Sequence, residues 1–81
     1  MILSGHAQDE MRRAGITEEN IEHCLMSGVL EIKQIVKGEM RYGKKLELKD
    51  KTIMVIYTFQ NKEERVITAY PVRRKKSWLR R

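Results

Sequence analysis

The sequence has only one cysteine, one proline and one tryptophan, and it contains no long apolar run. Because Cys24 has no second cysteine to pair with, an intramolecular disulfide is excluded, which fits a protein of a reducing cytosol. One cysteine and two histidines without paired spacing do not form a structural zinc site, so we expect neither a metal nor a cofactor. No apolar stretch approaches the roughly 20 residues that cross a bilayer, and the start of the chain turns polar too early for an export signal. These absences predict a soluble, cytoplasmic domain with no membrane contact.

Charged residues are abundant, but the two signs are distributed unevenly along the chain. The net charge is +6, and residues 72–81 hold six of the 17 basic side chains and none of the 11 acidic ones. Within the rest of the chain, residues 1–28 are net acidic and residues 29–71 are net basic. Such asymmetry indicates one surface that repels polyanions and another that attracts them. We therefore divide the chain into a domain of residues 1–71 and a basic C-terminal tail of residues 72–81.

Two helices are predicted before residue 28. The first runs from about Ser4, a suitable N-cap, to Ala14, and Gly15 stops it. Its apolar residues recur at helical spacing: Leu3, Ala7, Met11 and Ala14. The second helix begins at the N-cap Thr17, carries two glutamates in its first turn, and ends at Gly28.

After Gly28 the apolar residues alternate, which indicates strands. We expect four of them, near residues 30–36, 40–48, 53–59 and 66–70, with turns at residues 37–39, 50–51 and 61–62. Turns this short favour an antiparallel meander. The predicted fold is therefore α+β, with the two N-terminal helices packed on one face of a four-stranded antiparallel sheet. The other face is open, or is covered by a partner or by the tail.

His6 is the first residue that is suited to chemistry. Its neighbours at helical spacing are Asp9 and Glu10, and a carboxylate beside an imidazole raises its pKa, as suits a general acid or base. The alternative is an ordinary surface histidine in the first helical turn. Arg12 and Arg13 project away from the apolar stripe, where they either clamp a phosphate or are simply solvated.

Two strands carry polar residues of interest. Lys44 falls in the same alternation as the inward-facing Tyr42, so either Gly43 marks a bulge that redirects it, or Lys44 occupies a polar site within the sheet face. On the last strand, Thr68 and Tyr70 share one face, whereas Arg65 and Ile67 are expected on the other. Hydroxyl groups two residues apart can contact a phosphate, and a tyrosine ring can stack on a base. The alternative is an ordinary strand, since threonine and tyrosine are both good strand formers.

The tail is the most distinctive segment. It interleaves one aromatic residue with basic ones, including Arg73, Arg74, Lys75, Lys76 and Trp78. Positive charge for the backbone and a ring for stacking suit single-stranded nucleic acid. Alternatives are an acidic membrane surface, a partner protein, or a solubilising extension.

The helix that opens with His6-Ala7, the Gly15-Ile16-Thr17 that follows, and the final Val66-Ile67-Thr68-Ala69-Tyr70 strand resemble an uncharacterised bacterial family, a branch of the RelE/ParE-like toxin superfamily with the barnase/colicin/RelE fold. The resemblance covers residues 6–71. It implies a metal-independent, mRNA interferase-like endoribonuclease, encoded beside an antitoxin that is often a small zinc-finger protein, and acting on RNA free or on the ribosome. It also implies catalytic roles for His6, Glu31, Thr68 and Tyr70. Where the family has arginines on its first helix this chain has Glu10 and Ala14, so Arg12 and Arg13, which project elsewhere on the helix, are the candidate substitutes, and we include Arg13 in the site.

These observations lead to one main hypothesis and its rivals. The main hypothesis is an endoribonuclease toxin with catalytic His6, Thr68, Tyr70, Arg13 and Glu31. RNA would be bound by a larger set: Lys44, Lys45, Arg65, Arg73, Arg74, Lys75, Lys76 and Trp78. The rivals are a non-catalytic nucleic-acid-binding module and a protein-interaction module whose open sheet face or edge is completed by a partner.

Overall fold

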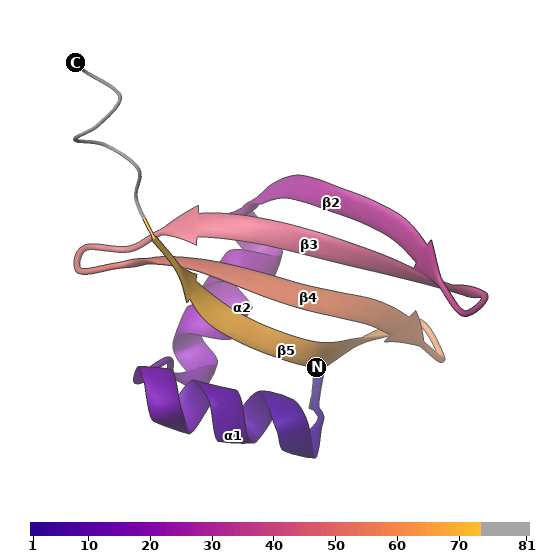
Figure 1. Ribbon diagram of the computed structural model, residues 1–81, viewed down its shortest axis with the longest axis horizontal. Helices are drawn as coiled ribbons and strands as arrows, with labels where there is room; N and C mark the ends of the chain where they lie inside the picture. The colour runs from indigo at the N-terminus through magenta and orange to yellow at the C-terminus, as the bar shows by residue number, and fades with distance from the viewer. Residues whose placement is uncertain (74–81) are drawn as a thin grey trace.

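The computed structural model describes residues 1–73, which form two helices and one five-stranded sheet (Figure 1). The elements in chain order are β1 (Ile2–Leu3), α1 (Gly5–Ala14), α2 (Glu18–Ser27), β2 (Val29–Val36), β3 (Glu39–Glu47), β4 (Thr52–Gln60) and β5 (Glu63–Val72). The strand order is β1-β5-β4-β3-β2, and β2 to β5 form the expected antiparallel meander.

The prediction of four antiparallel strands was wrong at one edge of the sheet. The residues before α1 form β1, which pairs with β5 in parallel, Ile2 opposite Arg65 and Leu3 opposite Val66. Two residues are too few to show an alternating pattern, so Leu3 was assigned to the helical stripe. In the structure its side chain packs against the core from the sheet instead.

Both helices begin at the predicted caps. The Ser4 hydroxyl accepts a hydrogen bond from the Ala7 amide (3.1 Å), and the Thr17 hydroxyl accepts one from the Asn20 amide (3.1 Å). The side-chain oxygen of Asn20 in turn accepts a hydrogen bond from the Thr17 amide (3.0 Å), which completes a capping box. Gly15 ends α1 in the left-handed conformation, with φ of 69°. Local capping therefore fixes where each helix starts, as the sequence predicted.

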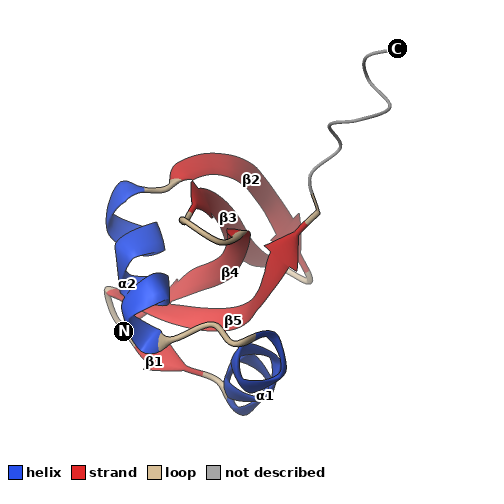
Figure 2. Ribbon diagram, turned by 90° about the vertical axis from the view of Figure 1, so that its left-hand side faces the viewer, coloured by secondary structure: helices blue, strands red, loops and turns tan. Residues whose placement is uncertain are grey.

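The core lies between the helices and one face of the sheet (Figure 2). The helices contribute Ala7, Met11, Ile21, Cys24 and Leu25, and the sheet contributes mainly Ile53, Val55, Tyr57, Val66 and Ala69. Helix α1 lies along β5, whereas α2 lies over β3 and β4. We call this side of the sheet the helix-covered face.

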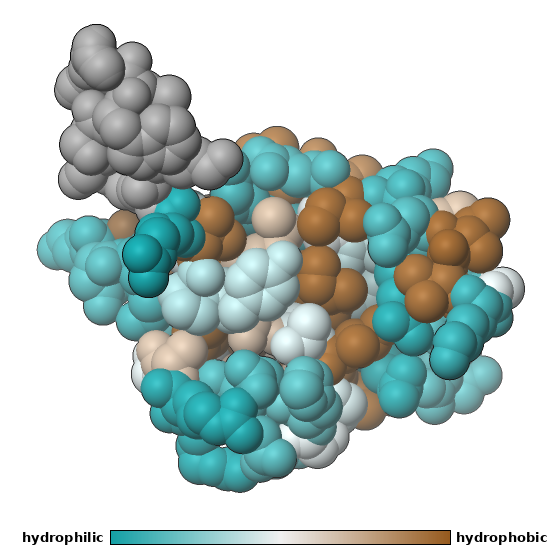
Figure 3. All heavy atoms as spheres, viewed as in Figure 1, coloured by the Kyte–Doolittle hydropathy of each residue, from teal (hydrophilic) through white to brown (hydrophobic). Residues whose placement is uncertain are grey.

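The opposite side, which we call the helix-free face, is turned toward the viewer in Figures 1 and 3. The sheet is strongly twisted and curled (Figure 2), so this face is partly closed without a helix: Met54 is 7% exposed and Thr58 4% exposed. At its centre lies Gly43, where a Cβ atom would come within 3.0 Å of the side chains of Ile32 and Ile56. Apolar side chains gather over the central strands in Figure 3, with hydrophilic ones around them.

Candidate nucleic-acid interface

Strand β5 carries three of the predicted site residues, Arg65, Thr68 and Tyr70, and a bulge determines which way their side chains point. Ile56 pairs with Thr68 but the next residue, Tyr57, pairs with Val66, so Ile67 is an extra residue on β5. Thr68 and Tyr70 lie on the helix-free face, because Tyr70 is opposite Met54 and Thr68 opposite Ile56.

The bulge also corrects the predicted position of Arg65. Strict alternation placed Arg65 on the face opposite to Thr68 and Tyr70. In the structure Arg65 pairs with Thr58, a residue of the helix-free face, because the extra Ile67 shifts the alternation by one residue. Arg65, Thr68 and Tyr70 therefore share one face. Within residues 1–73 the Arg65 guanidinium has no ion-pair or hydrogen-bond partner.

The third strand adds positive charge to the same face. Tyr70, which is 38% exposed, lies across Met54 from Lys45, and two strand spacings separate Tyr70 from Lys45 by about 10 Å. The Lys45 ammonium forms an ion pair with Glu31 at 3.2 Å. Glu31 is itself the extra residue of a second bulge, between Leu30 and Ile32 of β2. Because this ion pair is solvent-accessible it is weak, and Lys45 is free to exchange its carboxylate for a phosphate.

Lys44 lies on the helix-covered face. Its ammonium donates a hydrogen bond to the carbonyl oxygen of Leu25 at 2.6 Å, near the C-terminus of α2, and lies 5.8 Å from the centre of the Tyr57 ring. A cation there satisfies an otherwise unpaired helical carbonyl and suits the helix dipole. The predicted bulge at Gly43 was wrong for β3: this strand pairs with β4 without a register shift, and the bulge opposite Gly43 and Lys44 has its extra residue, Glu31, in β2. Lys44 therefore occupies a polar site within the sheet face, the other possibility that the sequence allowed.

Cys24 lies beside Lys44 and is fully buried. Its thiol donates a hydrogen bond to the Lys44 carbonyl oxygen (3.3 Å). Burial raises the pKa of the Cys24 thiol to about 11, against a smaller opposing effect of the Lys44 charge. A thiol held neutral in this way is a poor nucleophile, which indicates a packing role for Cys24.

His6 is exposed on the first turn of α1, at the margin of the sheet. The Ser4 hydroxyl donates a hydrogen bond to the carbonyl oxygen of Ile67 (3.1 Å), and the Ser4 amide donates to that of Val66 (3.1 Å). These bonds attach the first turn of α1 to the β5 bulge, next to Thr68.

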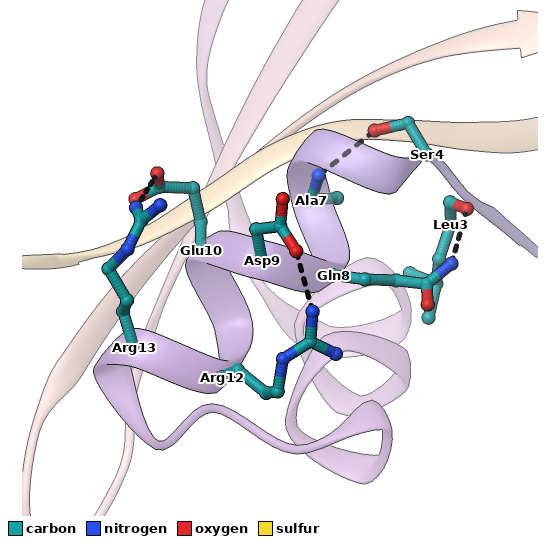
Figure 4. Close-up of polar contacts among 8 residues, drawn as sticks. All are labelled: Leu3, Ser4, Ala7, Gln8, Asp9, Glu10, Arg12 and Arg13. Atoms are coloured by element: carbon teal, nitrogen blue, oxygen red, sulfur yellow. Dashed lines mark hydrogen bonds and ion pairs between the residues drawn. The ribbon is translucent and has the colours of Figure 1, made fainter.

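The carboxylates expected to orient His6 have other partners. Asp9 pairs with Arg12 at 2.5 Å, and Glu10 pairs with Arg13 (Figure 4). Both arginines are largely exposed. The structure thus gives His6 no carboxylate partner among residues 1–73. The Arg13 guanidinium is paired with Glu10 on the surface of α1 and contacts no residue of β5 through an ion pair.

Arg73 follows directly after β5 and is exposed. The remaining predicted RNA contacts, Arg74, Lys75, Lys76 and Trp78, lie outside the described residues. Neither described helix has the length and apolar character needed to cross a bilayer. In the same part of the chain no three His, Cys, Asp or Glu side chains come together as they would around a metal ion.

Comparison with protein families gives one match, over residues 3–71, to the model of a domain of unknown function, DUF4258. The chain belongs to the DUF4258 family. The match covers both helices and nearly all of the sheet, including the β5 bulge, and ends just before the tail. No curated protein and no solved structure matches the chain. The family description assigns no activity to the domain.

Proposed function

We propose that this DUF4258 domain binds single-stranded RNA across the β5 side of its helix-free face and with its basic tail. The observation that carries the proposal is the Ile67 bulge, which places Arg65, Thr68 and Tyr70 on one face of the strand that leads directly into residues 72–81. We call Arg65, Thr68 and Tyr70 the β5 triad.

The chemistry of the β5 triad suits a nucleic-acid strand. An unpaired arginine contacts a phosphate with two parallel hydrogen bonds, and a half-exposed tyrosine ring offers a stacking platform for a base. Successive members of one strand face are about 7 Å apart, so several nucleotides can contact the face together. The six basic residues of the tail add a sequence-independent attraction to phosphates.

The proposal is tested by measuring the affinity for a single-stranded RNA as a function of salt. Arg65→Gln should weaken binding and lower the slope of log affinity against log salt by about 0.7, the value for one phosphate contact. Lys33→Gln is the matched control: it removes the same charge, but Lys33 is opposite Tyr42 and so lies on the helix-covered face. Equal effects of the two substitutions would show that only net charge matters, and would exclude the β5 triad as the binding surface.

Tyr70 allows a second test on the same face. Tyr70→Ala should cost about 1–3 kcal/mol of RNA binding through lost stacking, whereas Tyr70→Phe should bind nearly as well as the wild type. An Ala variant that binds like the wild type would remove Tyr70 from the interface.

Cleavage of the bound RNA is the second candidate function. It is favoured by the two Ser4 hydrogen bonds that hold the first turn of α1, and with it His6, against the β5 bulge. In metal-independent cleavage, a base takes the proton of a 2′-hydroxyl, whose oxygen attacks the adjacent phosphorus. The bond to the 5′-oxygen breaks, and an acid gives that oxygen a proton. His6 and Tyr70 are our candidates for these proton transfers, and Thr68 for holding a phosphate oxygen. The RelE/ParE-like toxin assignment and an antitoxin partner belong to this candidate.

Cleavage is tested by incubating the protein with bacterial RNA in excess chelator and reading the fragment ends. We expect cyclic-phosphate ends with the wild type, and at least a tenfold slower reaction with His6→Ala or Tyr70→Phe. Because Tyr70→Phe keeps the stacking ring, it separates cleavage from binding. RNA that is bound but stays intact would leave the binding function and exclude the ribonuclease.

A further inference from the structure

On the helix-covered face, the two helices leave part of the sheet open. A cavity of about 320 Å³ lies between α2 and the start of β5 and is lined by Met1, Glu22, Leu25, Met26 and Glu64. We call this cavity the acidic groove. Met26 is 84% exposed on its wall, and Phe59, which is opposite Glu64 in the sheet, is 53% exposed beside it. These two side chains give the acidic groove an exposed apolar rim.

The groove combines an apolar lining with negative charge. Neither Glu22 nor Glu64 forms an ion pair with a side chain of residues 1–73. Their charges are felt at the Met1 amine, whose pKa is raised first by its hydrogen bond to Glu63 and further by the charges of Glu63, Glu64 and Glu22. The groove therefore suits an apolar segment with basic residues on both sides.

The chain itself carries a segment of this chemistry. Trp78 and Leu79 stand between two basic pairs, Lys75-Lys76 and Arg80-Arg81. We propose that the acidic groove binds the C-terminal tail of a second copy of this chain, with Trp78 and Leu79 against Met26 and Leu25. The flanking basic side chains then lie near the carboxylates of Glu22 and Glu64.

The length and starting point of the tail favour the groove of a second copy over that of the same chain. Glu64 and Val72 lie near opposite ends of β5, which puts them roughly 25 Å apart at the rise of a strand. The six residues from Val72 to Trp78 reach at most about 20–22 Å when fully extended. They would also have to cross the sheet edge, because Val72 is opposite Thr52 on the helix-free face. Two copies that exchange tails form a closed dimer with two-fold symmetry. This inference does not rest on the proposed RNA binding, but RNA and the groove would compete for the same tail.

The test uses the full-length chain, free of RNA, in sedimentation experiments at increasing concentration. We expect a monomer–dimer equilibrium. The emission of Trp78, the only tryptophan, should shift to shorter wavelength as the dimer forms and the indole leaves water. Met26→Asp and Trp78→Ala should each raise the dissociation constant about tenfold or more. Ile35→Asp is the matched control, since Ile35 is 67% exposed on the edge strand β2, and it should leave the dimer intact.

Mixing two variants makes the test specific for exchange between chains. Met26→Asp retains an intact tail and Trp78→Ala retains an intact groove, so an equimolar mixture has one complete pair. We expect the mixture, but neither variant alone, to regain the Trp78 emission shift. The proposal is overturned by a chain that is monomeric at every concentration, by a dimer that Ile35→Asp breaks and Met26→Asp does not, or by a mixture without the shift.

Discussion

Lys44 and Lys45 are neighbours in β3, yet the two faces of the sheet give them different surroundings. The Lys44 ammonium is bound to the Leu25 carbonyl at the end of α2, 2.6 Å away, whereas that of Lys45 is paired with Glu31 on the helix-free face. The first contact belongs to the interior of the fold, and the second is accessible to a ligand. Two charged residues that are adjacent in a strand therefore do not form one basic patch. Conversely, residues that alternation would place on different faces can share one, since the β5 bulge brings Arg65 to the face of Thr68 and Tyr70.

The largest expected difference between the two faces concerns packing. Ile53 and Ile56 lie on the same strand, but Ile53 is fully buried under the helices and Ile56 is half-buried on the helix-free face. Ile53→Ala should lower the free energy of unfolding by about 2–5 kcal/mol, and Ile56→Ala by half of that or less. Urea denaturation measures both. Equal losses would mean that the helix-free face is as closed as the core, and so would argue against a binding role.

The second difference is between the two lysines. Lys44→Met should cost about 1–2 kcal/mol of stability, because the Leu25 carbonyl loses a charged donor near a helix C-terminus. Lys45→Met should change stability by less than about 0.5 kcal/mol, because it only breaks an exposed ion pair. The same denaturation experiment compares them, with the helical circular dichroism as a check that α2 is intact. A Lys45 variant as unstable as the Lys44 variant would contradict the division between the faces.

Much of the fold was predictable because its signals are local. Ser4, Thr17 and Gly15 act through contacts within a few residues, so the caps and ends of both helices could be read from the sequence. The hairpin between β2 and β3 is equally local, since Lys37 and Gly38 both adopt positive φ as a tight turn requires. Simple alternation also predicted that Thr68 and Tyr70 share one face of the sheet, as they do.

The wrong predictions concern features that depend on pairing with a strand far away in the sequence. Ile67 is a bulge without a glycine, in a strand that is apolar on both faces, so nothing in its pattern marks the extra residue. Its position depends on how β5 aligns with β4, and the face of Arg65 depends on it in turn. The strand β1 likewise exists only because β5 pairs with it. The ion pairs that occupy Asp9 and Glu10 depend on rotamers of α1, which residue spacing alone does not determine.

The smallest expected effect is a titration on the helix-covered side. Burial raises the pKa of the Cys24 thiol from its ordinary value of 9.0 to about 11, so the folded protein keeps the thiol neutral where the unfolded chain ionises it. The stabilisation is complete below pH 9 and is lost as the pH rises from 9 to 11, by about 1 kcal/mol at pH 10. Cys24→Ser lacks this titration, so the difference in unfolding free energy between wild type and variant should shrink between pH 7 and pH 10. A difference that stays constant over this range would show that water reaches Cys24 and that the helices exclude solvent less completely than the packing indicates.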